Sequence, residues 1–109
     1  MTPIEIKSMV EELGIPSAYY QFADKTELAP PFVCYFFTSS NDLSADNINY
    51  CRIERLNIEL YTDVKDFAPE ARLEQILTEH EIFFAKEETY IDSERMHETI
   101  YTSDVILEV

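Results

Sequence analysis

The sequence lacks several features on which common enzyme and membrane-protein motifs depend. Among its 109 residues only one is a glycine and none is a tryptophan. A phosphate-binding loop needs several glycines, and a nucleophile elbow needs glycines on both sides of its serine. A chain whose single glycine is Gly14 contains neither motif. The apolar runs fall far short of the roughly 20 residues that a membrane helix needs. Met1 begins a helical pattern and not the basic, apolar start of a signal peptide, so we expect a cytoplasmic protein.

Basic residues are also scarce, with 8 lysines and arginines against 22 acidic residues and a net charge of −14. Such a chain repels nucleic-acid phosphate, so direct non-specific binding to DNA or RNA is disfavoured. The acids are spread along the sequence and form no tail, which is typical of a solvated surface. The alternative is a negative surface with a purpose: a dock for a basic partner, a mimic of DNA, or the wall of a conduit for DNA.

Apolar residues are plentiful by contrast. Hydrophobic residues make up 46% of the chain and aromatic residues 13%, which is enough to build a packed interior. A length of 109 residues suits one core, so we predict a single domain over residues 1–109. Cys34 and Cys51 lie in strand-like segments, and we expect small buried hydrophobic residues there and no disulfide.

Two segments carry apolar residues at helical spacing. The first begins with Thr2 as N-cap and Glu5 as its capping-box partner, and it ends at Gly14. The second spans residues 67–81, with Asp66 or Ala68 as its cap. It follows the acidic segment 63–66, whose carboxylates we interpret as turn and cap groups and not as metal ligands. The stripes follow the i, i+3, i+4, i+7 pattern of a helix that packs on one face: Ile6, Met9, Val10 and Leu13, then Leu73, Ile76, Leu77 and His80.

Five segments rich in β-branched and aromatic residues predict strands, with a loop over residues 39–47 and a hairpin turn over residues 92–95. The third segment changes phase, because Ile53 is apolar on the opposite face from Leu56, so we expect a bulge or bend near Glu54. The predicted strands span residues 18–22, 32–38, 50–62, 82–91 and 96–107.

The order of these elements, α-β-β-β-α-β-β, predicts an α+β fold. We expect one mostly antiparallel five-stranded sheet with the two amphipathic helices on one face. The other face carries tyrosine, arginine, asparagine, glutamate and threonine. This polar but aromatic composition favours contact with a neighbouring molecule.

No combination of residues indicates catalysis. His80 and His97 lack the further ligands of a metal signature, so we interpret His80 as a partly buried helix-end residue and His97 as an ordinary strand residue. Paired carboxylates such as Glu87 and Glu88 are too frequent in this chain to mark a site. The segment 41–47 lacks the glycine and glutamate of a calcium loop. We predict no enzyme activity, no cofactor, and no catalytic, cofactor-binding or metal-binding residue.

Arg52 and Arg55 are rare cations on the longest predicted strand. The simple interpretation is a cross-strand salt bridge, which contributes less than about 1 kcal/mol where it is exposed. The alternative is a contact with an acidic patch on the next subunit of an assembly. With the aromatic residues Tyr50 and Tyr61, the two arginines are our candidates for a subunit interface.

Four segments together resemble a family of small phage and prophage proteins from Gram-positive hosts, whose genes lie in the head-to-tail morphogenesis cluster. These segments are "EELGIPSAYYQFA", "PPFVCYFF", "ADNINYCRIERLNIELYTDVKD" and "EETYIDSERMHETIYTSDVILEV". The resemblance covers nearly the whole chain and is most specific around "ELYTDVKD". No catalytic residue defines this family, so the resemblance assigns none here.

The order of elements is also similar to that of the tail terminator and tail-completion proteins of long-tailed phages. That resemblance implies a structural subunit that forms a hexameric ring, caps the tail tube and contacts the head connector. It implies assembly in the host cytoplasm, a final place in the virion, and passage of DNA without tight binding. The alternative is a small acidic binding or inhibitor protein of a prophage that mimics DNA.

Overall fold

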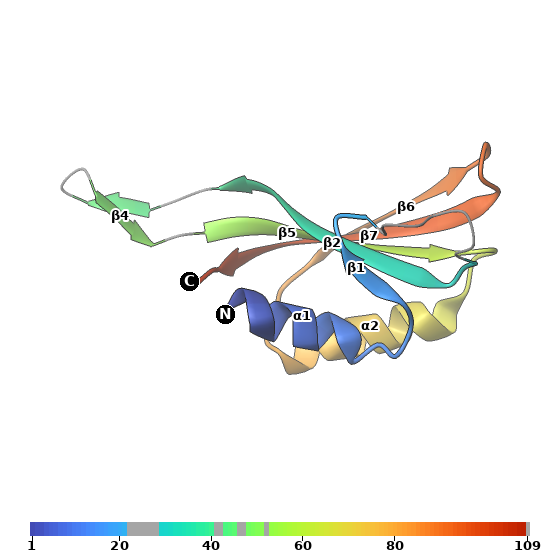
Figure 1. Ribbon diagram of the computed structural model, residues 1–109, viewed down its shortest axis with the longest axis horizontal. Coiled ribbons are helices and arrows are strands. Elements are labelled where there is room, and N and C mark those ends of the chain that lie inside the picture. Colours follow the sequence, from blue (N-terminus) through green and yellow to red (C-terminus); the bar gives the residue numbers. More distant parts are fainter. Residues whose placement is uncertain (22–28, 41–42, 46–47, 52, 109) are drawn as a thin grey trace.

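The two amphipathic segments form helices that pack on the same face of one sheet (Figure 1). The computed structural model of the chain describes residues 1–21, 29–40, 43–45, 48–51 and 53–108. The helices are α1 (Pro3–Glu11) and α2 (Phe67–Glu79). The sheet strands are β1 (Ser17–Tyr19), β2 (Phe32–Ser40), β5 (Ile53–Thr62), β6 (Ala85–Ile91) and β7 (Met96–Ile106), arranged in the order β1-β2-β5-β7-β6.

Both helices begin where the sequence predicts their caps. The Thr2 hydroxyl accepts a hydrogen bond from the Glu5 backbone N–H at 3.2 Å and donates one to the Glu5 carboxylate. The Asp66 carboxylate accepts a hydrogen bond from the Ala68 backbone N–H at 3.1 Å, so this acid is a cap, as predicted. Gly14 follows α1 with a φ of 79°, a left-handed conformation that glycine adopts without strain.

The predicted α+β class is confirmed, and the sheet is mixed. The pairs β2–β5, β5–β7 and β6–β7 are antiparallel, which agrees with the expectation of a mostly antiparallel sheet. Strand β1 is the exception, because it pairs with β2 in the parallel direction. A parallel pair needs a connection of about a dozen residues, and the chain between β1 and β2 is long enough to return to the same end of the sheet.

The segment between β2 and β5 corrects the prediction of a loop over residues 39–47. Strand β2 continues to Ser40, and a separate antiparallel ribbon follows it, formed by β3 (Leu43–Ala45) and β4 (Ile48–Cys51). The predicted long strand over residues 50–62 is therefore divided between β4 and β5. Asn, Asp and Ser favour turns, but here two short strands between such residues pair with each other. The ribbon extends past the end of the sheet and lengthens the molecule to 50 Å (Figure 1).

The predicted irregularity near Glu54 is confirmed. Phe37 lies opposite Leu56 and Ser40 lies opposite Glu54, so three residue steps along β2 match two steps along β5. The bulge therefore belongs to β2, the partner of the strand whose sequence changes phase. It lies at the end of the sheet from which the β3–β4 ribbon extends.

The hydrophobic core lies between the helices and the sheet. Leu56, Ile58 and Leu60 on β5 are fully buried, and Tyr101 on β7 is a fully buried aromatic residue among them. The apolar stripes of both helices are buried as predicted, apart from the last position of the second stripe. That position is His80, whose side chain is 34% exposed.

His80 joins the C-terminal ends of the two helices. Its Nε2 lies 2.6 Å from Glu12 Oε2, and the Arg72 guanidinium donates a hydrogen bond to the Glu12 backbone carbonyl at 3.0 Å. The prediction of a partly buried helix-end histidine is confirmed. Cys34 is buried in β2, as expected, whereas the side chain of Cys51 lies outside the described residues. None of the described helices is long and apolar enough to cross a membrane.

Candidate functional site

One face of the sheet carries neither of the two described helices, and we call it the open face. In Figure 1 both helices lie below the sheet and this face lies above it. Side chains on a strand alternate between its two faces, so the residues between the buried positions of β2, β5 and β7 form the open face. They are Phe32, Cys34, Phe36, Arg55, Asn57, Glu59, Tyr61, Glu98, Ile100, Thr102 and Asp104.

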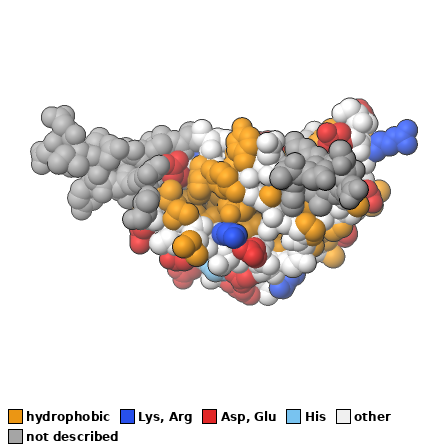
Figure 2. All heavy atoms as spheres, in the orientation of Figure 1, with side chains coloured by type: hydrophobic (Ala, Val, Ile, Leu, Met, Phe, Trp, Pro, Cys, Tyr) orange, Lys and Arg blue, Asp and Glu red, His pale blue; other side chains and the backbone are white. Residues whose placement is uncertain are grey.

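Aromatic residues gather at the end of the open face near β1 and β2. The rings of Phe32 and Tyr61 are stacked with centroids 4.8 Å apart, and the rings of Tyr20 and Phe36 lie 5.4 Å apart. At the adjoining sheet edge the side chain of Tyr19 is 52% exposed. Figure 2, which views the sheet edge-on as Figure 1 does, shows hydrophobic side chains gathered in the middle of the side that faces the viewer. Surface aromatic residues are enriched at protein–protein interfaces.

Two carboxyl groups lie side by side in the middle of the open face. The Tyr61 hydroxyl donates a hydrogen bond to Glu59 Oε2 at 2.6 Å, and Glu98 lies opposite Tyr61 on β7 with only 9% of its surface exposed. Burial, together with the adjacent Glu98 carboxyl, raises the pKa of Glu59 from its ordinary value of 4.5 to about 7. Burial and the hydrogen bonds to both glutamates raise the pKa of the Tyr61 hydroxyl. Glu59 therefore titrates near neutral pH.

The other end of the open face is charged and shallowly hollowed. The Arg55 guanidinium lies 3.3 Å from the Asp104 carboxylate, and both side chains are about half exposed. The Asn57 amide donates a hydrogen bond to the Thr38 hydroxyl at 2.8 Å. These residues and the exposed Phe83 line an open depression of about 560 Å³. Its mixed lining suits a polar segment of another protein better than an apolar ligand.

The side chains of two of the four predicted interface residues lie within the described part of the structure. Arg55 and Tyr61 lie on the open face, at opposite ends of β5. The predicted cross-strand salt bridge of Arg55 is confirmed, with Asp104 on β7 as its partner. Arg52 and the side chain of Tyr50 lie outside the described residues. Sequence reasoning did not single out Glu59 and Glu98, because their proximity depends on the adjacency of β5 and β7 in the sheet.

A second polar site lies between α2 and β6, on the helix-covered side of the sheet. We call it the buried charge cluster: Lys65, Glu70, Glu74, Lys86 and Glu88. Glu70 is 2% exposed, and its Oε1 accepts hydrogen bonds from Lys65 at 2.7 Å and Lys86 at 2.8 Å. Lys65 also contacts Glu88, and Lys86 lies 3.1 Å from Glu74. A carboxylate this deeply buried needs such partners to remain charged.

The two lysines keep Glu70 ionised. Burial alone would raise the pKa of Glu70, but the hydrogen bonds and positive charges of Lys65 and Lys86 outweigh it and lower that pKa. The hydrogen bond to Glu70 also raises the pKa of Lys86. The Tyr101 hydroxyl donates a hydrogen bond to Glu74 at 2.9 Å, and burial followed by this bond raises the pKa of Tyr101. The buried charge cluster thereby ties α2 to the β6–β7 hairpin.

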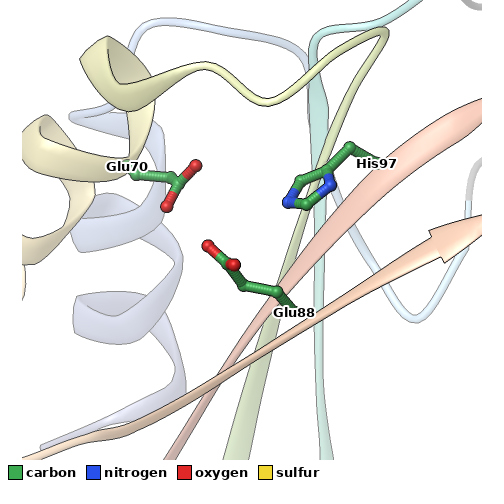
Figure 3. A group of neighbouring side chains, drawn as sticks. All are labelled: Glu70, Glu88 and His97. Carbon is green, nitrogen blue, oxygen red and sulfur yellow. The ribbon is translucent and has the colours of Figure 1, made fainter.

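Glu88 and His97 approach Glu70 from two neighbouring strands (Figure 3). One ligand atom from each of the three residues lies within 4.8 Å of the other two. From the sequence alone, Glu88 is uninformative and His97 is an ordinary strand residue. The hairpin register was the available signal, because the turn over residues 92–95 places Glu88 opposite Thr99 and on the same side as His97. The place of Glu70 depends on how α2 packs, which no local pattern reveals.

The two sites differ in what they can do. The open face offers aromatic rings, amide and hydroxyl groups and a carboxyl that titrates near neutral pH, which are groups that a protein-contact surface can use. The buried charge cluster with His97 offers oxygen and nitrogen atoms in the combination that binds transition metals.

No known protein family matches the chain, and no curated protein sequence matches it either. The functional interpretation therefore rests on the sequence and on the geometry of these two sites.

Proposed function

We propose that the chain is a structural protein of a long-tailed phage or prophage, either a tail terminator or a head–tail joining subunit. In this role it acts by assembling into a ring, hexameric by the family resemblance, at the end of the tail. It works in the host cytoplasm during assembly and then remains in the neck of the virion. Its partners are other copies of itself, the tail tube and the head connector.

The open face is the observation that carries this proposal. A sheet face without helices normally presents small polar groups to water, whereas this one presents the stacked Phe32 and Tyr61 rings and a glutamate whose pKa is raised to about 7. Such a face gains free energy when a neighbour covers it. The interface candidates Arg55 and Tyr61 both lie on it.

A closed ring also needs two different surfaces on each subunit, because head-to-tail contacts are heterologous. The β3–β4 ribbon, which extends past the end of the sheet, is a suitable second surface (Figure 1). Within the described part of the chain, β1 and β6 are the edge strands of the sheet, and such edges present backbone groups that a neighbouring chain can pair with. We expect the ribbon of one subunit to lie on the open face or the β1 edge of the next.

The acidity of the chain fits the same role. With a net charge of −14, most surfaces of a ring would be negative, including the wall of a central channel. A negative wall repels DNA phosphate and lets the genome pass without sticking.

An acidic inhibitor that mimics DNA is the competing function. A mimic displays its carboxylates on one surface at spacings like those of phosphates. Glu54 is buried on the helix-covered side of β5, whereas Glu59 lies on the open face and is only partly ionised near neutral pH. The distribution of acids along this strand therefore weighs against a mimic.

Electron microscopy of phage that lacks this chain tests the proposal. We expect tails of uncontrolled length, or heads and tails that fail to join. Ile100→Arg on the open face should reproduce the defect, because it puts a large charged group in the middle of the proposed interface. Ala71→Arg on the exposed side of α2 is the matched control and should support normal assembly.

Normal virions from phage without the chain would refute the proposal. In isolation, mass measurement at high protein concentration should detect oligomers of the native chain that Ile100→Arg weakens. A strict monomer that captures a basic host nuclease or polymerase would instead support the acidic inhibitor.

A further inference from the structure

We propose that Glu70, Glu88 and His97 form a binding site for a transition-metal ion of the zinc class. The three residues come from α2, β6 and β7, and their side chains converge between the helix and the hairpin (Figure 3). One oxygen or nitrogen atom from each lies within 4.8 Å of the other two. This site is independent of the proposed role in tail assembly.

Two atoms at this point are buried without a hydrogen-bond partner among the described residues. They are Glu70 Oε2 and His97 Nε2. Buried polar atoms almost always have a partner, because losing water without replacement is unfavourable. Glu70 is only 2% exposed, so nearly all of its surface is buried. Its Oε1 accepts hydrogen bonds from both lysines, and its Oε2 is the atom left for a further ligand.

The donor set favours zinc or a similar ion. One imidazole nitrogen and two carboxylate oxygens match the ligands of zinc, manganese or cobalt, whereas magnesium and calcium prefer oxygen ligands alone. Zinc bonds of about 2.0–2.2 Å bring tetrahedral ligand atoms to roughly 3.5 Å from one another. Because the three ligand atoms lie within 4.8 Å of one another, they need to close by at most about 1.3 Å, a movement within the reach of glutamate rotamers.

Lys65 is the competitor for this site. Its Nζ lies 2.7 Å from Glu70 Oε1 and also contacts Glu88, so the ammonium group now neutralises both carboxylates. An ion bound to Glu88 would displace the Lys65 ammonium group from that carboxylate. The Lys65 side chain is 31% exposed, and its Nζ already lies 4.8 Å from the centre of the Phe67 ring, where the ammonium can remain. Lys86 is able to keep its contacts with Glu70 and Glu74 while the ion is bound.

A bound ion would fasten α2 to the β6–β7 hairpin. Each of the three elements contributes one ligand, so binding stabilises their packing and makes it depend on metal concentration. Three protein ligands also leave one position of a tetrahedral ion open to water or to a partner's side chain.

Titration of the isolated chain with Zn²⁺, by calorimetry and by native mass spectrometry, tests the site. We expect one ion per chain and no binding of Mg²⁺ under the same conditions. Removing an outer-shell partner typically weakens metal binding about 10–100-fold, so Glu88→Gln and His97→Asn should weaken it by at least about tenfold. His80→Asn is the matched control, because its imidazole pairs with Glu12 far from this site, and it should bind zinc as the native chain does.

Lys65→Met gives the more specific result. If the ammonium group competes with the ion, its removal should tighten zinc binding severalfold. This increase is expected even though the variant loses the ion pairs of Lys65 with Glu70 and Glu88. Circular dichroism confirms that each variant is folded. The proposal is overturned if native chain binds no zinc, if His97→Asn binds it as tightly as native chain, or if Lys65→Met binds it more weakly.

Discussion

The residues of strand β5 differ sharply in burial between the two faces of the sheet. On the helix-covered side of β5, Leu56, Ile58 and Leu60 have no exposed surface at all. On the open face, the alternating residues of the same strand are half-buried or exposed, and they include a guanidinium, an amide, a carboxyl and a phenol. The covered face is complete within one chain. The open face has aromatic and carboxyl groups that a single chain leaves only partly covered, which is why we place assembly there and stability on the other side.

The two faces also differ in how each accommodates the charge of a glutamate. Each holds a glutamate that is withdrawn from water. On the covered side two lysines neutralise Glu70 and lower its pKa, so it stays charged. On the open face Glu59 lies beside another carboxyl, and its pKa rises to about 7, so it is partly protonated at neutral pH. A carboxylate held by lysines is a permanent tie within the fold, whereas a carboxyl that titrates near neutral pH makes the open face sensitive to its surroundings.

The largest expected difference between the faces is the loss of stability when an apolar side chain is shortened to alanine. Ile58 is fully buried on the covered side and Ile100 is half-buried on the open face. Ile58→Ala should lower the free energy of unfolding by about 2–5 kcal/mol, because it removes packed atoms and leaves a cavity. Ile100→Ala should lower it by about 1 kcal/mol in the isolated chain, where water reaches the site. Urea denaturation of both variants measures the two values. Equal losses would mean that the open face is packed within the subunit, contrary to our description.

The next largest effect is the pH dependence that Glu59 adds. Its pKa is about 7 in the folded chain and is taken as 4.5, its ordinary value, in the unfolded chain. Between these two values the folded state binds more protons, so stability falls as pH rises through this window and stays lower above it. One pKa unit corresponds to about 1.4 kcal/mol, and partial exposure of the carboxyl reduces the total, so we expect a loss of about 2 kcal/mol. Denaturation at a series of pH values measures it.

Two variants separate this effect from other titrations. Glu59→Gln should remove the decline between pH 4.5 and about 7 and make the folded chain more stable above neutral pH. Tyr61→Phe should act in the opposite direction, because the Tyr61 hydrogen bond lowers the pKa of Glu59 and its loss lets that pKa rise. If both variants keep the native pH profile, the proton on Glu59 has no part in stability.

Local patterns were sufficient for the elements that depend on neighbours in sequence. The caps at Thr2 and Asp66, the apolar stripes and the hairpin turn over residues 92–95 all follow from spacing, and the structure confirms them. An irregularity near Glu54 was predicted from the change of phase in β5, and the structure has one at that point of the β2–β5 pair, although β5 itself runs without a break against β7. The place of the bulge in β2 was not predictable, since either strand of a pair can carry the extra residue.

Long-range arrangement was out of reach. The parallel β1 depends on the path from β1 to β2, and the β3–β4 ribbon consists of short strands whose Asn, Asp and Ser residues equally suit a loop. The candidate sites are harder still to predict from the sequence, because each is formed by residues from separate elements. Glu59 meets Glu98 only because β5 lies beside β7, and Glu70 meets His97 only because α2 packs over the hairpin. Arg55 was correctly placed on an exposed strand, but its partner Asp104 required the strand order.

The smallest expected effect concerns that salt bridge, and it decides whether Arg55 belongs to the subunit or to its neighbour. The two side chains are 51% and 52% exposed, so their attraction is largely screened by water. A double-mutant cycle with Arg55→Met and Asp104→Asn should give a coupling free energy below about 1 kcal/mol in the isolated chain, decreasing further with added salt. A coupling well above this would mean that Arg55 is committed to Asp104 and contributes little to assembly. If the coupling is small, the cation is available at little cost to the fold, and Arg55→Met should then weaken oligomers more than it weakens the subunit.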